Sequence, residues 1–145
     1  MVAEVVSRAT LPASAEKVFA RAVDLSKADW LPSVSGIQHV GGAASGVGAQ
    51  YNVLVHFMGH DSESLLTCTK FDPPRQAVFS VDEGMKLTLQ LEVIPVEGGS
   101  ELALTLSYRV GGGPFGAMAE KASEPAARHE VSRAVEAFAA NFRRR

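Results

Sequence analysis

Between residues 85 and 110 the chain alternates twice between apolar and polar side chains. The apolar positions are Met85, Leu87, Leu89, Leu91 and Val93 in the first run, and Leu102, Leu104, Leu106, Tyr108 and Val110 in the second. A period of two with one apolar face is typical of a strand that is buried on one side. A two-residue turn at Gly98-Gly99, which tolerate positive φ, places Val93 opposite Leu104 and Leu89 opposite Tyr108. The pattern therefore predicts a hairpin with one long apolar face.

A second hairpin is predicted upstream. A turn at Gly59-His60 separates a strand over 50–58 from a strand over 61–71. This turn places Val55 opposite Ser64, and the alternation again puts the apolar side chains on one face.

Two further turn signals connect these hairpins. Asp72-Pro73-Pro74-Arg75 is rich in turn residues, and continuing the strands across it sets Phe79 beside Cys68. A three-residue turn at 82–84, with glycine in the left-handed position, sets Phe79 against Leu87. The chain from 50 to 110 is thus predicted to form four successive hairpins that share one apolar face.

The N-terminal part predicts a strand, two short helices and another strand. Residues 2–11 form the first strand, and Ser14 is a suitable N-cap for a helix over 15–23. A second short helix is predicted over 26–31, and a short strand over 35–40.

The C-terminal residues 115–143 follow a helical pattern, with Pro125 as the expected site of a kink. A helix of this length spans about 43 Å, enough to cross a sheet. A long twisted antiparallel sheet tends to curl, and this helix is the element able to cover its concave face. We therefore expect a single α+β domain over 1–145. In it, a curved antiparallel sheet of about seven strands wraps around the long helix, and two short helices follow the first strand.

Several short motifs carry a resemblance to a known family. They are Pro-Ala-Ser-Ala-Glu-Lys-Val-Phe at 12–19, Asp29-Trp30, Gly46-Val47-Gly48, Phe71-Asp72-Pro73-Pro74-Arg75, and Gly-Pro-Phe-Gly at 113–116. Together with the order of elements, they resemble the START-like helix-grip superfamily, also called SRPBCC. Within it the chain is most similar to the small bacterial polyketide cyclase/dehydrase and lipid-transport group. The resemblance covers the whole chain and implies a helix-grip fold with a cavity between sheet and long helix for a lipid or other apolar small molecule.

The residues expected to line that cavity point inward from the strands, the helical elbow and the long helix. They are Trp30, Tyr51, Val53, Val55, Phe57, Ser64, Phe79, Leu89, Leu91, Leu104, Leu106, Tyr108, Phe115, Met118 and Ala122. The long helix is rich in alanine, and small side chains that face a curved sheet leave volume unfilled. In the alternative, the alanines let the helix dock closely and the sheet flattens against it.

Five side chains with polar or reactive groups face this region or lie close to it. The hydroxyls of Tyr51 and Tyr108 would take a ligand oxygen as partner, and Trp30 either stacks on the ligand or packs the elbow onto the sheet. Lys70 has inward parity near a strand end, from which its ammonium group can reach water. Cys68 is interpreted as a small core residue. No nucleophile–base arrangement can be assembled, so no catalytic residue is assigned.

Two motifs match known binding patterns, but we do not expect either of them to bind a cofactor or a metal. Residues 111–116 match G-x-G-x-x-G, but no strand follows the helix and Pro114 lacks an N–H, so we expect a hinge and no cofactor. His56, His60, Asp61 and Glu63 are metal-ligand types around a tight turn. The alternative, which we favour, is a solvated hairpin end with a His56–Glu63 cross-strand pair and no metal.

Charge and composition limit the classes of partner and the cellular compartment that we expect for this protein. The net charge of −2 over 145 residues argues against a nucleic-acid partner, which usually requires a basic surface. No apolar run approaches the length of a membrane span, and no signal peptide is evident. The lone Cys68 fits a reducing compartment, so a cytoplasmic protein is expected. The oligomeric state, monomer or homodimer, stays open.

Three functions follow as hypotheses. The first is binding or transport of a hydrophobic or amphipathic small molecule, a lipid or a polyketide-like compound. The second is a polyketide aromatase/cyclase or dehydratase, since cyclases of the family place Arg, Tyr and Trp around the substrate. Arg75 and Arg109 fall on the outer face by parity. The third is a protein-interaction module of the toxin–antitoxin or cochaperone type, which would expose an apolar patch.

Overall fold

The structure is a computed structural model that describes residues 3–25, 30–31, 34–43, 46–57, 60–81, 86–109 and 114–143. Within these ranges the side chains of Ala3, Phe57, His60, Arg109, Ala126 and of residues 114–124 and 142–143 are not described. The elements are β1 (Ala3–Leu11), α1 (Ala15–Val23), β2 (Val34–Gly41), β3 (Gln50–Phe57), β4 (His60–Asp72), β5 (Gln76–Val81), β6 (Lys86–Val96), β7 (Gly99–Arg109) and α2 (Pro114–Arg143). The second short helix predicted over 26–31 falls largely outside the described residues.

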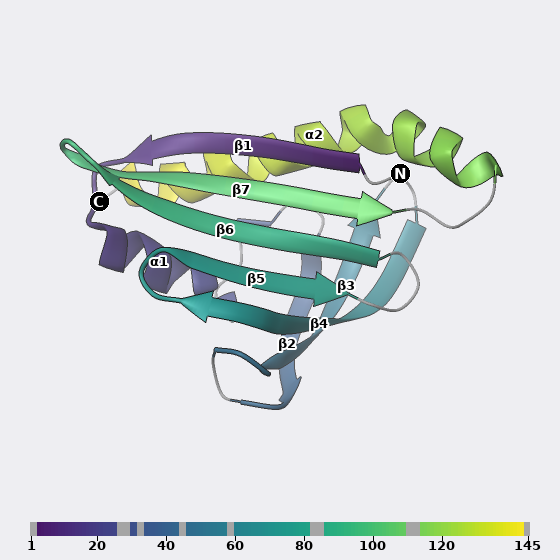
Figure 1. The fold of residues 1–145 in the computed structure, drawn as a ribbon, viewed down its shortest axis with the longest axis horizontal. Coiled ribbons are helices and arrows are strands. Elements are labelled where there is room, and N and C mark those ends of the chain that lie inside the picture. Colours follow the sequence, from purple (N-terminus) through teal and green to yellow (C-terminus); the bar gives the residue numbers. More distant parts are fainter. Residues whose placement is uncertain are drawn as a thin grey trace.

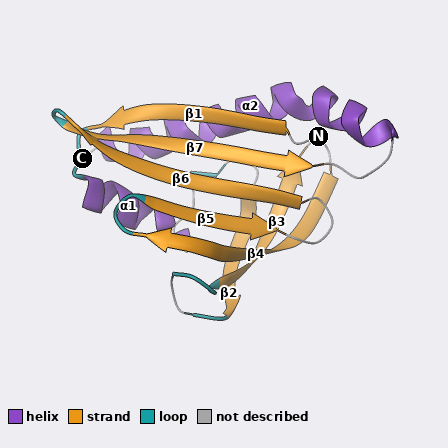
Figure 2. Cartoon of the chain, in the orientation of Figure 1, coloured by secondary structure: helices purple, strands orange, loops and turns teal. Residues whose placement is uncertain are grey.

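The seven strands form one antiparallel sheet in the order β1-β7-β6-β5-β4-β3-β2. Both helices lie behind the sheet in the view of Figure 1, and β2 and β3 run steeply across the direction of β1, β6 and β7 (Figures 1 and 2). The sheet is thus strongly curved, and its concave face carries both helices. This arrangement confirms the predicted α+β helix-grip architecture.

Helix α1 forms where the sequence predicted it. Its N-cap is Ser14, whose hydroxyl oxygen accepts a hydrogen bond from the Lys17 backbone N–H at 3.3 Å. The buried face of α1 consists of Ala15, Val18, Phe19 and Ala22. Because these positions recur at three- and four-residue spacing, one stripe of the helix packs on the sheet and the flanking positions stay accessible.

The pairing between β6 and β7 differs from the predicted one by two residues. Val93 pairs with Leu102, and Leu89 pairs with Leu106, so the predicted partners Leu104 and Tyr108 were wrong. The turn lies at 97–98, where Gly98 has a φ of 82°. Gly99 instead belongs to β7, where an added Cβ would lie 1.9 Å from the carbonyl oxygen of Leu11, the last residue of β1. Gly98 therefore provides the positive φ of the turn, and Gly99 allows the close approach of the β1 backbone.

The same two-residue difference occurs in two other hairpins. Val55 pairs with Ser62 and not with Ser64, and Phe79 pairs with Leu89 and not with Leu87. His60 joins β4, and the β5–β6 connection is longer than the predicted three-residue turn, which accounts for both shifts. An even shift preserves which face a side chain occupies, so the predicted apolar face is still the buried one.

A β-bulge at Thr69 changes the direction of the side chains at the end of β4. Cys68 pairs with Phe79 as predicted, but the next partner of β5 is Lys70, which leaves Thr69 as the extra residue. The bulge reverses the alternation, so the inward parity predicted for Lys70 was wrong and this side chain is exposed. Phe71 takes the inward direction, and its ring meets that of Phe19.

The C-terminal half of α2 packs against β1 and β7. Its buried residues are Ala127, Val131, Ala134, Val135, Phe138 and Ala139. The helix continues through Pro125, close to its predicted bounds. Trp30, which is 1% exposed, lies edge-on to Phe138 with ring centroids 5.1 Å apart. In the part of the chain that the structure describes, no helix is both long and apolar enough to cross a membrane.

Candidate ligand-binding site

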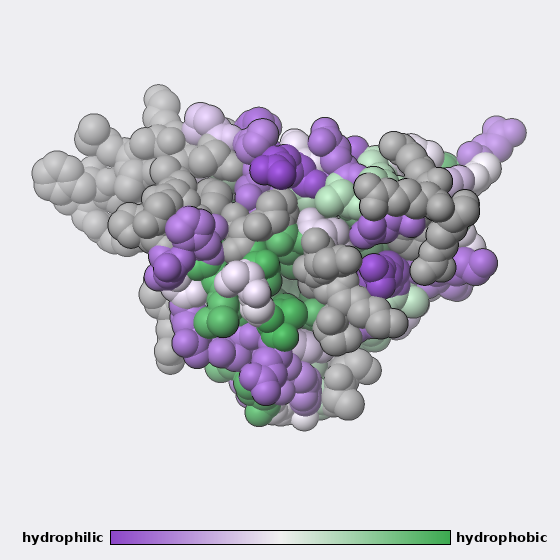
Figure 3. Space-filling view, turned by 180° about the vertical axis from the view of Figure 1, so that it is seen from behind, coloured by the Kyte–Doolittle hydropathy of each residue, from purple (hydrophilic) through white to green (hydrophobic). Residues whose placement is uncertain are grey.

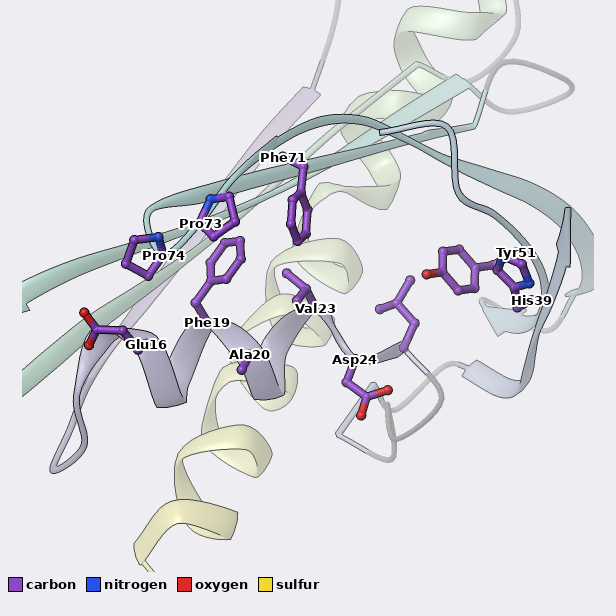
Figure 4. A pocket seen from close by; sticks show the side chains of 11 residues that line it. Glu16, Phe19, Ala20, Val23, Asp24, His39, Tyr51, Phe71, Pro73 and Pro74 are labelled. Carbon is purple, nitrogen blue, oxygen red and sulfur yellow. The ribbon is translucent and has the colours of Figure 1, made fainter. Parts of the chain in front are cut away.

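A cavity of about 640 Å³ lies between α1 and the β2–β4 end of the sheet (Figure 4). Helix α1 and the residues after it contribute Glu16, Phe19, Ala20, Val23, Asp24 and Leu25, and the sheet with its β4–β5 turn contributes His39, Tyr51, Phe71, Pro73 and Pro74. Its volume falls within the range of about 300–1,000 Å³ that is typical of small-molecule sites.

The α1 wall of the cavity is one edge of the helix. Glu16, Ala20 and Val23 follow a spacing of four and three residues, which places them along a single line. Phe19 lies beside this line and is buried, so its ring forms the base of the wall where helix and sheet meet. The amphipathic pattern that docks α1 thus also gives the cavity its helical side.

The opposite wall comes from the end of β4 and the turn that follows it. The bulge at Thr69 directs Phe71 inward, and Pro73 and Pro74 continue the surface beyond it. The turn is held by the Arg75 backbone N–H, which donates to the Asp72 carbonyl at 2.8 Å. Arg75 also forms an ion pair with the Asp72 carboxylate at 2.9 Å. Arg75 is exposed, as its predicted outward parity required.

Tyr51 supplies a polar group to this largely apolar lining. It is paired with His39 across β2 and β3, and the two rings meet edge to face with centroids 5.4 Å apart. The imidazole Nε2 of His39 donates to the Ala43 carbonyl at 2.8 Å. The Tyr51 hydroxyl points into the cavity (Figure 4), and no hydrogen-bond partner for it occurs in the described part of the chain.

The surroundings of Tyr51 disfavour ionisation of its hydroxyl. Burial raises the pKa of Tyr51 above its usual value, and the negative charges of the Cys68 thiolate and the Asp24 carboxylate act in the same direction. Burial also raises the pKa of Cys68, whose thiol donates to the Lys70 carbonyl at 3.4 Å. The phenol is therefore available as a neutral hydrogen-bond donor to a bound oxygen.

Of the predicted lining residues whose side chains the structure describes, Tyr51 is the one that lines this cavity. Val53, Phe79, Leu91, Leu104 and Tyr108 are buried in the core, while Val55, Ser64, Leu89 and Leu106 are partly buried. Trp30 packs on Phe138. The side chains of Phe57, Phe115, Met118 and Ala122 lie outside the description. A second cavity lined by these residues beneath α2 stays a prediction.

The sequence reasoning missed the α1 wall and the prolines. The line of Glu16, Ala20 and Val23 could have been found from its helical spacing, next to the predicted buried stripe. Phe71 could not, because nothing in the sequence marks the bulge that turns it inward.

The histidine-rich hairpin end differs from its predicted pairing. The shifted register sets His56 beside Asp61, with which it forms a side-chain hydrogen bond, so the predicted His56–Glu63 pair was wrong. Glu63 instead accepts a hydrogen bond from the Asn52 side chain at 2.8 Å. Among the residues that the structure describes, no group of three or more His, Cys, Asp or Glu side chains is arranged to hold a metal ion. The motif at 111–116 begins outside the described residues.

Solved structures with the same fold cover almost the entire chain. A protein of Thermus thermophilus has a TM-score of 0.83 at 20% identity, with 98% of each chain covered. A START superfamily protein of Mycobacterium smegmatis has a TM-score of 0.78 at 16% identity, with 97% of each chain covered. The Zhui aromatase/cyclase of a Streptomyces species has a TM-score of 0.84 at 15% identity and covers 100% of this chain and 96% of its own. At these identities the likeness concerns the fold.

Sequence comparison gives the family directly. No curated protein matches the chain. A family model described as polyketide cyclase/dehydrase and lipid transport matches residues 2–145. The motifs at the start of α1 and at the Asp72–Arg75 turn, on which the resemblance was based, both border the cavity. The chain therefore belongs to the polyketide cyclase/dehydrase and lipid-transport family.

Proposed function

We propose that this protein binds a hydrophobic or amphipathic small molecule in the cavity between α1 and the β2–β4 end of the sheet. The observation that carries the proposal is the combination of a ligand-sized volume of about 640 Å³, an aromatic and aliphatic lining, and an inward hydroxyl. The family name joins polyketide chemistry and lipid transport, and both concern molecules with large apolar parts.

The lining suits an apolar chain or ring system. Phe19, Val23, Leu25 and Phe71 offer apolar surface, and Pro73 and Pro74 add two side chains that lack donors. Each methylene moved from water into such a site contributes about 0.8 kcal/mol, so affinity should increase with the length of the apolar chain once the cost of association is met. The Tyr51 hydroxyl orients the ligand by donating to an oxygen atom.

The position of the cavity on the helix-bearing side supports the same function. Figure 3 shows that side, where apolar residues gather near the centre of the view and hydrophilic residues lie around them. An apolar surface recessed between polar surroundings is typical of a site that takes a small molecule.

The proposal is tested by filling the cavity from α1. Ala20 lines the cavity but is itself exposed, so Ala20→Trp occupies the volume without disturbing the core. Gln38 is exposed on β2 next to His39 and points to the opposite face, so Gln38→Trp is the matched control. Binding is measured with Nile red, an uncharged apolar dye whose fluorescence rises in apolar surroundings.

We expect Ala20→Trp to lower Nile red affinity at least about tenfold, and Gln38→Trp to leave it unchanged. Organic extraction of the purified wild type followed by mass spectrometry would identify any molecule that copurifies. Equal binding by wild type and Ala20→Trp would rule out this cavity as the site. Absence of both dye binding and a copurified molecule would argue against a small-molecule function.

A further inference from the structure

The cavity extends along α1, and its two ends differ in the side chains that line them. The α1 side of the lining runs from Glu16 to Asp24, a rise of about 12 Å at 1.5 Å per residue. Pro73 and Pro74 lie toward the start of this run, and Tyr51 lies toward its end (Figure 4). A molecule that fills the cavity therefore lies along the helix, in one of two directions.

The end near the start of α1 is largely apolar. The Pro73-Pro74 pair carries no backbone N–H, and Ala20 adds a methyl group. The rings of Phe19 and Phe71 contact each other, with centroids 5.4 Å apart, so a ligand lies against this pair of rings and not between them. Glu16 is exposed, so its carboxylate can stay in water. This end therefore suits the apolar part of a ligand.

The other end of the cavity holds the Tyr51 hydroxyl. His39 pairs with Tyr51 across β2 and β3 and meets its ring edge to face, while its own imidazole donates to the Ala43 carbonyl. These contacts hold the Tyr51 ring so that the hydroxyl points into the cavity (Figure 4). Tyr51 is 9% exposed, so a ligand that fills this end displaces the water that the hydroxyl can reach.

The Tyr51 hydroxyl makes binding depend on the atom that the ligand places beside it. A hydrocarbon group there displaces water without offering an acceptor, and a buried hydroxyl without a partner costs free energy. An oxygen atom of the ligand accepts a hydrogen bond from the hydroxyl and removes that cost. The described lining contains no lysine or arginine, and one neutral donor compensates an ionised oxygen poorly, so an uncharged oxygen is favoured.

We infer that the cavity binds elongated apolar molecules in one direction, with an uncharged oxygen, such as that of a ketone or an ester, at Tyr51. The apolar chain then extends along α1 toward Pro73, and Tyr51 is the residue that determines specificity. This inference rests on the proposed function, since it concerns the same site, and it adds the class of the ligand and its direction.

A matched pair of probes tests the role of Tyr51: nonan-2-one and 2-methylnon-1-ene, in which a methylene group replaces the oxygen. Both displace Nile red, whose own Kd is measured first for each variant. Tyr51→Phe should lower the preference for the ketone over the alkene about tenfold, because the ketone loses its donor and the alkene no longer covers an unpaired hydroxyl. Tyr108→Phe removes a hydroxyl from the core outside this cavity and should keep the wild-type preference.

A series of methyl ketones tests the direction of binding. From hexan-2-one to decan-2-one, affinity for the wild type should rise by up to about fourfold per methylene. Ala20 lies one helical turn, about 6 Å, before Asp24, so Ala20→Trp should abolish this rise for the longer ketones and change hexan-2-one by less than about twofold. Tyr51→Phe should instead weaken every member of the series by a similar factor.

The outcomes separate this inference from the proposed function. An unchanged ketone-to-alkene preference in Tyr51→Phe, or a tenfold loss for hexan-2-one in Ala20→Trp, overturns the inference, while Nile red binding leaves the proposed function intact. A preference lost in Tyr108→Phe and kept in Tyr51→Phe also overturns it, since the oxygen would then lie elsewhere. If neither Nile red nor any ketone binds the wild type, the binding function and this inference both fail.

Discussion

The ring of Phe71 meets the ring of Phe19 edge to face, with centroids 5.4 Å apart and planes inclined by 61°. One ring comes from the end of β4 and the other from α1, so this contact closes the base of the cavity. The contact exists because the bulge at Thr69 directs Phe71 toward the helix. Edge-to-face pairs contribute about 0.5–1.5 kcal/mol beyond the area they bury.

Replacing Phe71 by alanine should lower stability and enlarge the cavity together. We expect a loss of about 2 kcal/mol in the free energy of unfolding, below the usual range for a fully buried phenylalanine because Phe71 is only half-buried. Urea denaturation measures the change. Leu65→Ala is the control, because Leu65 is 47% exposed and should cost less than about 0.5 kcal/mol. Equal losses in the two variants would contradict the packing role of Phe71.

The adjacent glycines of the β6–β7 hairpin should differ sharply in their tolerance of alanine. At Gly99 an added Cβ would lie 1.9 Å from the Leu11 carbonyl oxygen, so Gly99→Ala must separate the backbones and should cost about 3 kcal/mol or more. At Gly98, with a φ of 82° and nothing within 4 Å, alanine should cost about 1–2 kcal/mol. Thermal and urea unfolding of the two variants compare them directly. A larger loss of stability for Gly98→Ala than for Gly99→Ala would mean that the turn conformation, and not the contact between Gly99 and Leu11, limits substitution.

Stability should fall as the pH rises above about 9 to 10. The pKa values of Cys68 and Tyr51 are raised by folding from reference values of 9.0 and 10.0. Above those values the unfolded chain loses protons that the folded chain retains, so the free energy of unfolding decreases with pH. Urea titrations at pH 8, 9, 10 and 11 measure this slope. Tyr51→Phe should reduce it above pH 10, and Cys68→Ala should reduce it from pH 9.

The ionisation of Tyr51 can be observed separately. The chain has two tyrosines, so the difference at 295 nm between wild type and Tyr51→Phe during an alkaline titration isolates the Tyr51 phenolate. We expect its midpoint to lie above 10.0. A midpoint at or below that value would mean that the hydroxyl is fully solvated and outside an apolar site.

A tryptophan at Leu106 distinguishes the cavity beside α1 from the one predicted beneath α2. Leu106 pairs with Leu89 in the middle of the sheet, is partly buried and does not line the described cavity. We therefore expect Leu106→Trp to change Nile red affinity by less than about threefold, against the tenfold loss for Ala20→Trp. If Leu106→Trp instead abolishes binding while Ala20→Trp does not, the ligand binds beneath α2.

The strands and their buried face could be predicted because both follow from the alternation of apolar and polar residues along the chain. The alternation from Leu87 to Val93 and from Leu102 to Tyr108 fixes the side on which each residue lies, and an even shift in pairing leaves that side unchanged. The residue partners across the β6–β7 hairpin could not be predicted, since turn chemistry allows either Gly98-Gly99 or the turn at 97–98. The choice depends on the close approach of β1 to Gly99, a contact between distant parts of the chain.

The position of the cavity beside α1 could not be predicted. The sequence led to the expectation of a cavity between the sheet and the C-terminal helix, with Tyr51 in its lining, whereas the cavity that Tyr51 lines in the structure lies beside α1. Its location beside α1 depends on Phe71, whose direction follows from one extra residue in β4. Nothing in the sequence around Thr69 distinguishes this extra residue from an ordinary strand residue.

The bulge at Thr69 divides β4 into two stretches with different structural roles. Before it, Leu66 and Cys68 belong to the hydrophobic core, whereas after it Phe71 faces the cavity. Substitutions beyond the bulge can therefore alter which molecule is accepted while the packing that sustains folding stays as it is. A single inserted residue would in this way let one strand diversify its chemistry at one end and conserve its architecture at the other.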